Sequence, residues 1–199
     1  MLKKFILLVL ISFIFVGCEN PFSETNTQQS AGVDLSRFNS IYAFQEMSQW
    51  CWAACISMVF AYHGHPVRQD RIVNEAYGGV VNMPSGGGPR ICEMLNRDWI
   101  DDNGKSFSSR VQSVYDYYYN MYGLDNNTLI NELNNNRPIV IGVGGHAVIL
   151  LKVYYHNSNN IEKAEVFDPW PGRGYRYLLP AEMVPSANGF HFAVIASIQ

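Results

Sequence analysis

The sequence lacks any cluster of lysine and arginine outside its first few positions, and its formal net charge is −3. A basic surface is what draws a protein to nucleic acid or to an anionic membrane. We therefore expect no nucleic-acid partner and look for ligands in a pocket or groove. A phosphate loop is also missing, because the glycine-rich residues 78–90 contain no GxxxxGK[ST] order and no lysine. This stretch is expected to be either one wall of a cleft or a mobile surface loop.

Long apolar runs are equally scarce. Residues 5–16 form one that follows two lysines and ends at Gly17-Cys18, and it is shorter than the about 20 residues that a membrane-spanning helix needs. This arrangement is typical of a secretion signal, and a small residue directly before a cysteine resembles a bacterial lipobox. We expect residues 1–17 to be a lipoprotein signal peptide and Cys18 to carry a diacylglyceryl thioether. The alternative is an ordinary signal peptide followed by a chance cysteine.

The next segment, residues 18–40, is polar, poor in aliphatic side chains and without periodicity. Such a composition is typical of a flexible tether. Residues 41–199 remain, a length that ordinarily forms one domain of about 100 to 200 residues. We expect a domain attached to a membrane by its lipid, in the bacterial cell envelope and outside the cytoplasm.

Cysteines are few, four in all, and an exported protein usually pairs them. With Cys18 lipidated, three remain, Cys51, Cys55 and Cys92, so at least one is free or pairs with another chain. A zinc site would need His63 or His65 as further ligands at a poor spacing, and no metal or other cofactor is expected. A disulfide from Cys51 to Cys55 would span one helical turn and be strained. Cys55 is expected to be a small buried residue or, alternatively, to bridge to Cys92.

The stretch QWCWAAC opens an apolar segment with the pattern of a buried helix. Ser48 is a plausible N-cap for it, which would place Cys51 in the first helical turn. Unpaired backbone N–H groups and the positive end of the helix dipole stabilise a thiolate there. Cys51 is therefore our candidate nucleophile.

A nucleophilic cysteine needs a base, and the sequence offers five histidines. His63 and His65 end the cysteine helix about three turns from Cys51, too far for contact at about 1.5 Å per residue. His156 falls in a polar turn and His191 within a strand-like run. The remaining histidine, His146, follows a glycine-rich break and begins a β-branched strand, which makes it the preferred base.

The partner of this histidine is suggested by the turn that follows its strand. If the chain forms a hairpin centred on Asn157, residues equidistant from the centre face one another, and His146 then faces Asp168. A carboxylate so placed could orient the imidazole, although it could also be an ordinary strand-end residue. Gln45, six residues before Cys51, could supply an oxyanion donor together with the Cys51 backbone N–H.

These residues together resemble papain-like cysteine peptidases, in particular a small bacterial branch with a WCWAA segment that includes effector proteases and bacteriocin-processing peptidase domains. The resemblance runs from Gln45 through Cys51-Trp52 and Gly-His146-Ala-Val to Asp168-Pro-Trp170. It implies Cys51 as nucleophile, His146 as base, Asp168 as its orienter and Gln45 as oxyanion donor. Trp52 and Trp170 are supporting residues, and Trp170 would shield the histidine–aspartate contact.

The resemblance implies a peptidase that hydrolyses a peptide or protein substrate through a thioester. Whether a protein inhibitor is a further partner stays open. Amidases, transglutaminases and acyltransferases use the same three side chains, and a surface lipoprotein that only binds is also conceivable. The implied fold is α+β, an N-terminal helical part with the nucleophile helix packed against a C-terminal antiparallel sheet. The active cleft would lie between the two parts.

Periodicity predicts the elements of this fold. The expected helices span residues 51–63, 67–77, 89–98 and 126–135, and the expected strands span residues 138–143, 146–155, 163–168 and 190–198. Residues 110–122 fit either a helix or a strand, and their tyrosines are expected in the core and at the rim.

Overall fold

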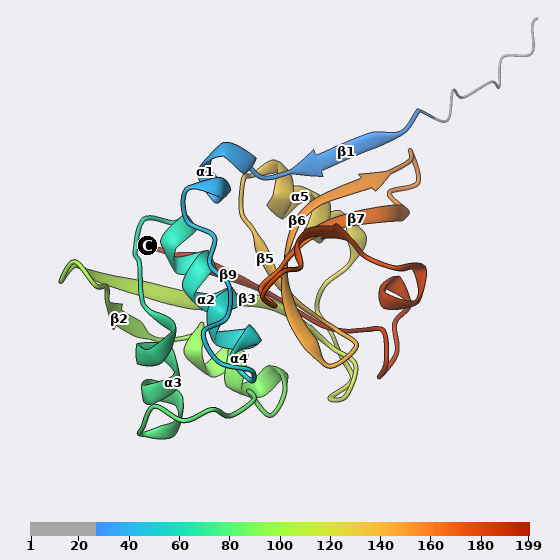
Figure 1. The fold of residues 1–199 in the computed structure, drawn as a ribbon. Helices are drawn as coiled ribbons and strands as arrows, with labels where there is room; N and C mark the ends of the chain where they lie inside the picture. The colour runs from blue at the N-terminus through green and yellow to red at the C-terminus, as the bar shows by residue number, and fades with distance from the viewer. Residues whose placement is uncertain (1–26) are drawn as a thin grey trace, which may run out of the picture.

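The computed structural model describes residues 27–199, which form five α-helices around a nine-stranded sheet (Figure 1). The helices are α1 (Leu35–Asn39), α2 (Cys51–Tyr62), α3 (Gln69–Tyr77), α4 (Gly88–Met94) and α5 (Asn126–Asn134). The strands are β1 (Gln29–Gly32), β2 (Asp98–Ile100), β3 (Ser106–Asp116), β4 (Met121–Tyr122), β5 (Ile139–Val143), β6 (His146–Tyr155), β7 (Ile161–Asp168), β8 (Gly174–Tyr177) and β9 (Phe190–Ile198). A short 3-10 helix, Pro180–Met183, lies between β8 and β9.

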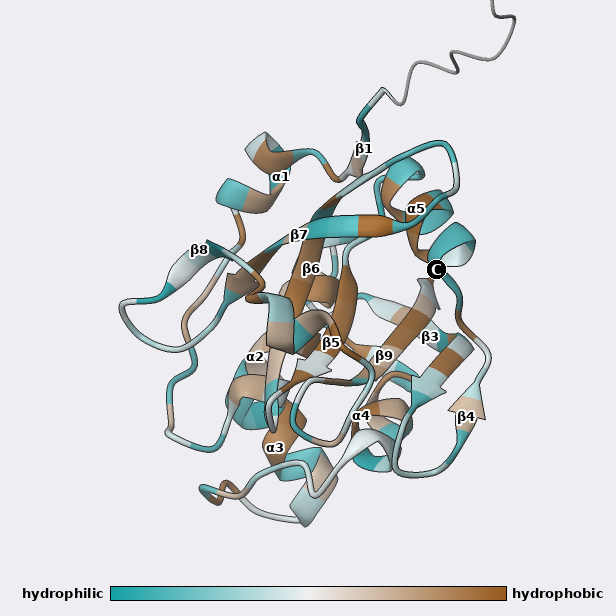
Figure 2. Ribbon diagram, turned by 90° about the vertical axis from the view of Figure 1, so that its right-hand side faces the viewer, coloured by the Kyte–Doolittle hydropathy of each residue, from teal (hydrophilic) through white to brown (hydrophobic). Residues whose placement is uncertain are grey.

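The sheet is antiparallel, with the strand order β2-β3-β9-β5-β6-β7-β8. Its central strands are brown, and thus hydrophobic, along most of their length in Figure 2. Residues paired across antiparallel strands point to the same face, and successive residues along a strand point to opposite faces. Helix α2 packs on one face of β5 and β6, and α5 also contacts both strands. The expected α+β fold is therefore confirmed.

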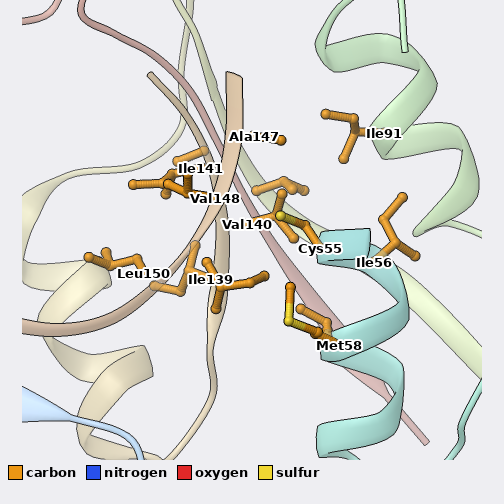
Figure 3. Close-up of a cluster of buried hydrophobic side chains, with 14 of the residues drawn as sticks. Cys55, Ile56, Met58, Ile91, Ile139, Val140, Ile141, Ala147, Val148 and Leu150 are labelled. Carbon is orange, nitrogen blue, oxygen red and sulfur yellow. The ribbon is translucent and has the colours of Figure 1, made fainter. Parts of the chain in front are cut away.

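Helix α2 is apolar on nearly every side because it is enclosed by other elements. Nine of its twelve residues are buried. Cys55 and Met58 extend from it toward the side chains of the sheet in Figure 3, whereas Ile56 points toward Ile91 of α4. Such close packing fixes where the first residue of the helix lies.

All four expected helices and all four expected strands are present, with ends shifted by at most four residues. The ambiguous residues 110–122 belong to β3 and β4, joined by a turn, because β3 pairs with β9 along most of its length. Tyr115 is buried there, whereas Tyr117, Tyr118, Tyr119 and Tyr122 are exposed, as expected for core and rim.

The predicted start of the folded region at residue 41 is wrong, because the domain includes residues of the supposed tether. Strand β1 pairs with residues 152–155 at the end of β6, beyond Leu150, where the pairing of β6 with β5 ends. Phe38 of α1 is fully buried, with its ring against Tyr62 and Phe167. The polar residues around Phe38 lie on the surface, which explains why the composition resembled a tether.

The predicted signal peptide, residues 1–17, and the predicted lipidation site Cys18 lie outside the described residues. From residue 27 onward, none of the helices is both long and apolar enough to cross a bilayer.

Candidate active site

Cys51 is the first residue of α2 and its side chain is partly exposed. Trp50, not Ser48, occupies the N-cap position, and it makes no side-chain capping bond. The Ser48 hydroxyl instead accepts a hydrogen bond from Asn82 Nδ2 at 2.9 Å. The predicted cap is thus wrong, but its consequence holds: the N–H of Cys51 has no acceptor within the helix, as is usual for a first turn.

The tryptophans on either side of Cys51 hold the glycine-rich loop. Trp50 Nε1 donates to the Val81 carbonyl at 2.9 Å, and Trp52 Nε1 donates to the Met83 carbonyl at 3.2 Å. The Gln49 backbone N–H adds a bond to Asn82 Oδ1 at 3.0 Å. Both indoles are buried, so breaking these bonds would leave donors without water or protein partners. The loop is therefore fixed beside the candidate nucleophile.

His146 comes to the site through a tight hairpin turn. Gly144 and Gly145 both have positive φ, 56° and 79°, and Val143 pairs with His146 across the turn. Two consecutive positive φ values define a type I′ turn, which glycine adopts without steric cost. The turn places His146 at the first position of β6, at the end of the sheet that faces α2.

His146 Nε2 lies 2.6 Å from Asp168 Oδ1, a short hydrogen bond. The predicted hairpin register, in which His146 and Asp168 face each other directly, is nevertheless off by two residues. Ile149 pairs with Phe167, and two irregularities interrupt the pairing of β6 with β7. The histidine side chain reaches Asp168 along the diagonal. With Nε2 directed at the carboxylate, Nδ1 is the nitrogen left for Cys51.

Asp168 is fully buried and accepts several hydrogen bonds. The Trp170 backbone N–H donates to Oδ1 at 3.0 Å, and Arg176 Nε donates to Oδ2 at 2.9 Å. Arg176 is itself held by Glu182 through two bonds of 2.7 and 3.0 Å. Burial raises the pKa of Asp168, but the bond from His146 and the other donors outweigh it and hold that pKa well below its usual range.

The electrostatics favour a protonated His146. Burial lowers its pKa, but its hydrogen bonds with Asp168 and with the Cys51 side chain outweigh burial and raise the pKa from 6.5 to about 9. The imidazole is therefore an imidazolium at neutral pH. Its positive charge lies beside the sulfur of Cys51, the candidate nucleophile.

Cys51 and His146 line a cleft of about 470 Å³ between the helical part and the sheet. The glycine-rich loop contributes one wall of this cleft, as one of the two interpretations of residues 78–90 required. The opposite wall comes from β3, β5, β6 and β9. The lining residues are Gln49, Cys51, Trp52, Pro84, Ser85, Gly86, Gly87, Gly88, Ile91, Asp116, Tyr118, Tyr119, Gly142, Gly145, His146, Ala147, His191 and Phe192.

Gln45 is buried beside the site, but its side chain does not line the cleft. Its Nε2 donates to the Met47 carbonyl at 2.9 Å, and its backbone N–H donates to the Pro169 carbonyl at 2.8 Å. The second bond joins the segment before Cys51 to the residue that follows Asp168. Gln49 lines the cleft instead, and sequence reasoning missed it because a surface glutamine carries no distinguishing pattern.

Trp170 packs beside the histidine in an edge-to-face arrangement, with ring centroids 6.4 Å apart. The indole is 42 % exposed, so one side of it faces solvent while the other covers the His146 ring. This contact agrees with the shielding role expected for Trp170.

The remaining cysteines and histidines lie outside this arrangement. Cys55 and Cys92 are free thiols, so the alternative of a bridge between them is wrong. Burial raises the pKa of Cys55 well above its ordinary range and that of Cys92 to about 11. His65 lies 3.2 Å from Asp101 in a separate buried pair. In residues 27–199, no group of three or more His, Cys, Asp or Glu side chains is arranged to hold a metal ion.

Comparison with known proteins places this geometry in a family. Residues 20–185 match the model of the Peptidase_C39 like family. Among curated proteins, no sequence matches significantly. Two solved structures are similar to this chain at low identity.

One is the UfSP protein from C. elegans, with a TM-score of 0.51, 16% identity, and coverage of 86% of this chain and 34% of that protein. This chain thus spans about a third of the length of UfSP, and the likeness concerns the fold. The other is a double glycine motif protease from an AMS/PCAT transporter, solved in complex with the leader peptide. There the TM-score is 0.45 and the identity 17%, over 77% of this chain and 87% of that protein.

The family match spans 166 residues, from 20 to 185, and so covers more than half of the chain. It includes the helix that begins with Cys51, the hairpin that begins with His146, and Asp168. The chain therefore belongs to the Peptidase_C39 like family and is a papain-like cysteine protease.

Proposed function

We propose that this protein is an exported, lipid-anchored cysteine peptidase that hydrolyses peptide bonds of a peptide or protein substrate through a thioester on Cys51. The observation that carries the proposal is the His146 imidazole, which bonds to buried Asp168, lines the same cleft as Cys51 and has its pKa raised by both groups. Both reacting groups open into one cleft wide enough for a peptide. A nucleophile, a base and an orienting group in this order are what acyl transfer requires.

The reaction begins with attack of the Cys51 thiolate on the substrate carbonyl carbon. The carbonyl oxygen becomes an oxyanion, which the free N–H of Cys51 is placed to receive. The second donor that we propose is Gln45 Nε2, which gives one of its two hydrogens to the Met47 carbonyl and has to turn into the cleft to reach the oxyanion with the other. The His146 imidazolium then gives its proton to the leaving amine, and the C–N bond breaks to form the thioester.

Hydrolysis of the thioester reverses these roles. The neutral His146 takes a proton from water, the hydroxide adds to the thioester carbonyl, and the C–S bond breaks to release the carboxylic acid. The imidazolium and the thiolate are thereby restored. Asp168 keeps Nε2 engaged throughout, so that Nδ1 stays directed at the sulfur and the attacking water.

The test uses residues 27–199, treated with limiting iodoacetamide across pH 4 to 9, with the alkylated cysteine mapped by mass spectrometry. We expect fast labelling of Cys51 alone, because Cys55 is buried and burial disfavours the thiolate of Cys92. His146→Ala should slow this labelling, with an unchanged circular dichroism spectrum as the folding control. Slow labelling spread over all three thiols would refute an activated pair.

Reaction class is decided in the same preparation by a peptide library. Peptide cleavage that disappears in Cys51→Ser and in His146→Ala supports a peptidase. Acyl transfer to an added amine without hydrolysis would assign the site to a transglutaminase-like enzyme, and a reactive Cys51 with neither activity would point to an amidase of small substrates.

The lipid anchor is tested separately in the full chain. We expect an alkyne-labelled fatty acid to be incorporated at Cys18 in a bacterial host and the protein to appear in the membrane fraction. Cys18→Ser should abolish both. A Cys18→Ser protein that still fractionates with membranes would contradict attachment through the lipid.

A further inference from the structure

The far end of the cleft holds a buried carboxylate that the mechanism does not use. Asp116, the last residue of β3, lines the cleft and is only 2% exposed. Its Oδ1 accepts the backbone N–H groups of Tyr118 and Tyr119 at 3.0 and 3.3 Å. Within residues 27–199, no donor bonds to Oδ2.

No cation balances this carboxylate. Asp116 takes part in none of the ion pairs between residues 27 and 199, and the lining of the cleft includes no lysine or arginine. His191 is nearby, but burial lowers its pKa, which favours the neutral ring at pH 7. A buried charge is costly unless an opposite charge or several hydrogen bonds compensate it. The second oxygen of Asp116 is therefore free to accept a donor that enters the cleft.

The sheet register connects Asp116 to the reacting groups. Asp116 pairs with Phe192, Phe192 pairs with Gly142, and Gly142 pairs with Ala147, the neighbour of His146. Paired residues share a face of the sheet, so this row points into the cleft on the side of α2. Three strand spacings separate its ends, roughly 14 Å, which about four extended residues span, or fewer with a long side chain.

Two glycines keep the row open. A Cβ on Gly88 would lie 2.3 Å from Asp116 Oδ2, and a Cβ on Gly142 would lie 2.6 Å from His191 Nε2. A side chain at Gly88 would clash with the Asp116 carboxylate. A side chain at Gly142 would fill the space between Asp116 and His146. Tyr118 and Tyr119 are exposed at the rim of the same end. Aromatic faces attract organic cations, so a carboxylate flanked by tyrosines suits an ammonium or guanidinium group.

We propose that Asp116 determines specificity by binding a lysine or arginine side chain of the peptide substrate, a few residues from the bond that is cleaved. The cation pairs with Oδ2 while Oδ1 remains bonded to the tyrosine backbone. This inference rests on the proposed peptidase function and specifies its substrate class. The charge of the peptide near its cleavage site, not only its shape, then decides which substrates are cut.

The first experiment needs only the wild-type domain. A positional peptide library compares lysine, acetyl-lysine and glutamine at each position around the cleavage site. We expect one position at which lysine raises kcat/KM about tenfold to hundredfold over acetyl-lysine, the range for a hydrogen-bonded ion pair. If lysine and acetyl-lysine are cleaved equally at every position, Asp116 only holds its own turn and the inference is overturned.

The second experiment assigns the preference to this carboxylate. Asp116→Asn keeps an oxygen for the Tyr118 and Tyr119 N–H groups and replaces Oδ2 by an NH₂ of similar size. It should remove the lysine preference, so that the lysine and acetyl-lysine peptides are cleaved with equal kcat/KM. Asp98→Asn, an exposed carboxylate on β2 outside the cleft lining, is the matched control and should keep the preference.

The outcomes separate this inference from the proposed function. If Asp116→Asn keeps the full preference, the inference is wrong while the peptidase stands. If the wild-type domain cleaves none of the peptides, the proposed function fails and the inference fails with it. If the variant does not fold, as judged by circular dichroism, the wild-type comparison of lysine with acetyl-lysine decides the question.

Discussion

The charge on Asp168 should set the pH at which His146 loses its proton. The difference between a pKa of about 9 in the protein and the ordinary 6.5 corresponds to roughly 3 kcal/mol in favour of the protonated ring, at about 1.4 kcal/mol per pKa unit. Both Asp168 and Cys51 contribute to this stabilisation of the protonated ring. Asp168→Asn removes the charge and keeps an oxygen for His146 Nε2, so the pKa of His146 should fall by at least about one unit.

The assay is an NMR titration of the imidazole signals from pH 5 to 10 in both proteins, with Asp98→Asn as control. Because Asp168 and Cys51 both contribute to the pKa of His146, the measured midpoint reports the imidazole together with these neighbours. A wild-type midpoint near 6.5, or an Asp168→Asn midpoint equal to the wild type, would refute the reasoning.

The raised pKa of His146 also makes the free energy of unfolding depend on pH. A raised folded-state pKa contributes stability that is fully present below pH 6.5 and is lost as the pH rises through about 9. For Asp168, whose pKa is depressed, the contribution is present above its ordinary 3.8 and is lost as the pH falls below that value. Urea unfolding measured from acid to alkaline pH should therefore give the wild type its highest free energy of unfolding between about pH 3.8 and pH 6.5.

Three further substitutions test the architecture. Phe38→Ala should lower the free energy of unfolding in urea by about 3–5 kcal/mol, because the ring is fully buried; a loss below about 1 kcal/mol would place α1 outside the fold. Gln45→Ala should lower kcat by about 10²–10³ if its amide binds the oxyanion, and a larger loss in Gln49→Ala would transfer that role to Gln49. Trp52→Phe removes one bond to the glycine-rich loop, at a cost of about 1 kcal/mol, and should speed hydrogen exchange at residues 79–87; unchanged exchange would mean that the indole does not hold the loop.

Local patterns predicted the elements that carry their own signal. The apolar segment that begins at Cys51 and the β-branched run after His146 have the lengths and periodicities of a buried helix and strand, and the structure has both. Pairing of Asp168 with His146 followed from counting residues about the turn. The predicted contact is correct although the register is off by two residues, because the histidine side chain reaches a diagonal neighbour on the next strand.

Elements that depend on distant partners were not predictable in the same way. Strand β1 has a sequence, QSAG, without strand propensity, and it exists because the end of β6 has an open edge. The helix begins two residues later than an N-cap at Ser48 would require, and the Ser48 hydroxyl accepts a hydrogen bond from Asn82, far away in sequence. Asp116 was not predicted because only the pairing of four strands brings it into one row with Ala147, the neighbour of His146.

The nucleophile and the base belong to different layers, so their separation depends on packing remote from the chemistry. Cys51 is fixed by α2, whose Cys55 and Met58 lie against the sheet, whereas His146 is fixed by a glycine turn within that sheet (Figure 3). Within the described residues 27–199, the backbone bond from Gln45 to the Pro169 carbonyl is the only hydrogen bond between the segment before the helix and the residue after Asp168. Because a misplacement of about 1 Å can cost about 10²-fold in rate, cavity-forming substitutions under α2 should lower kcat even in variants that remain folded.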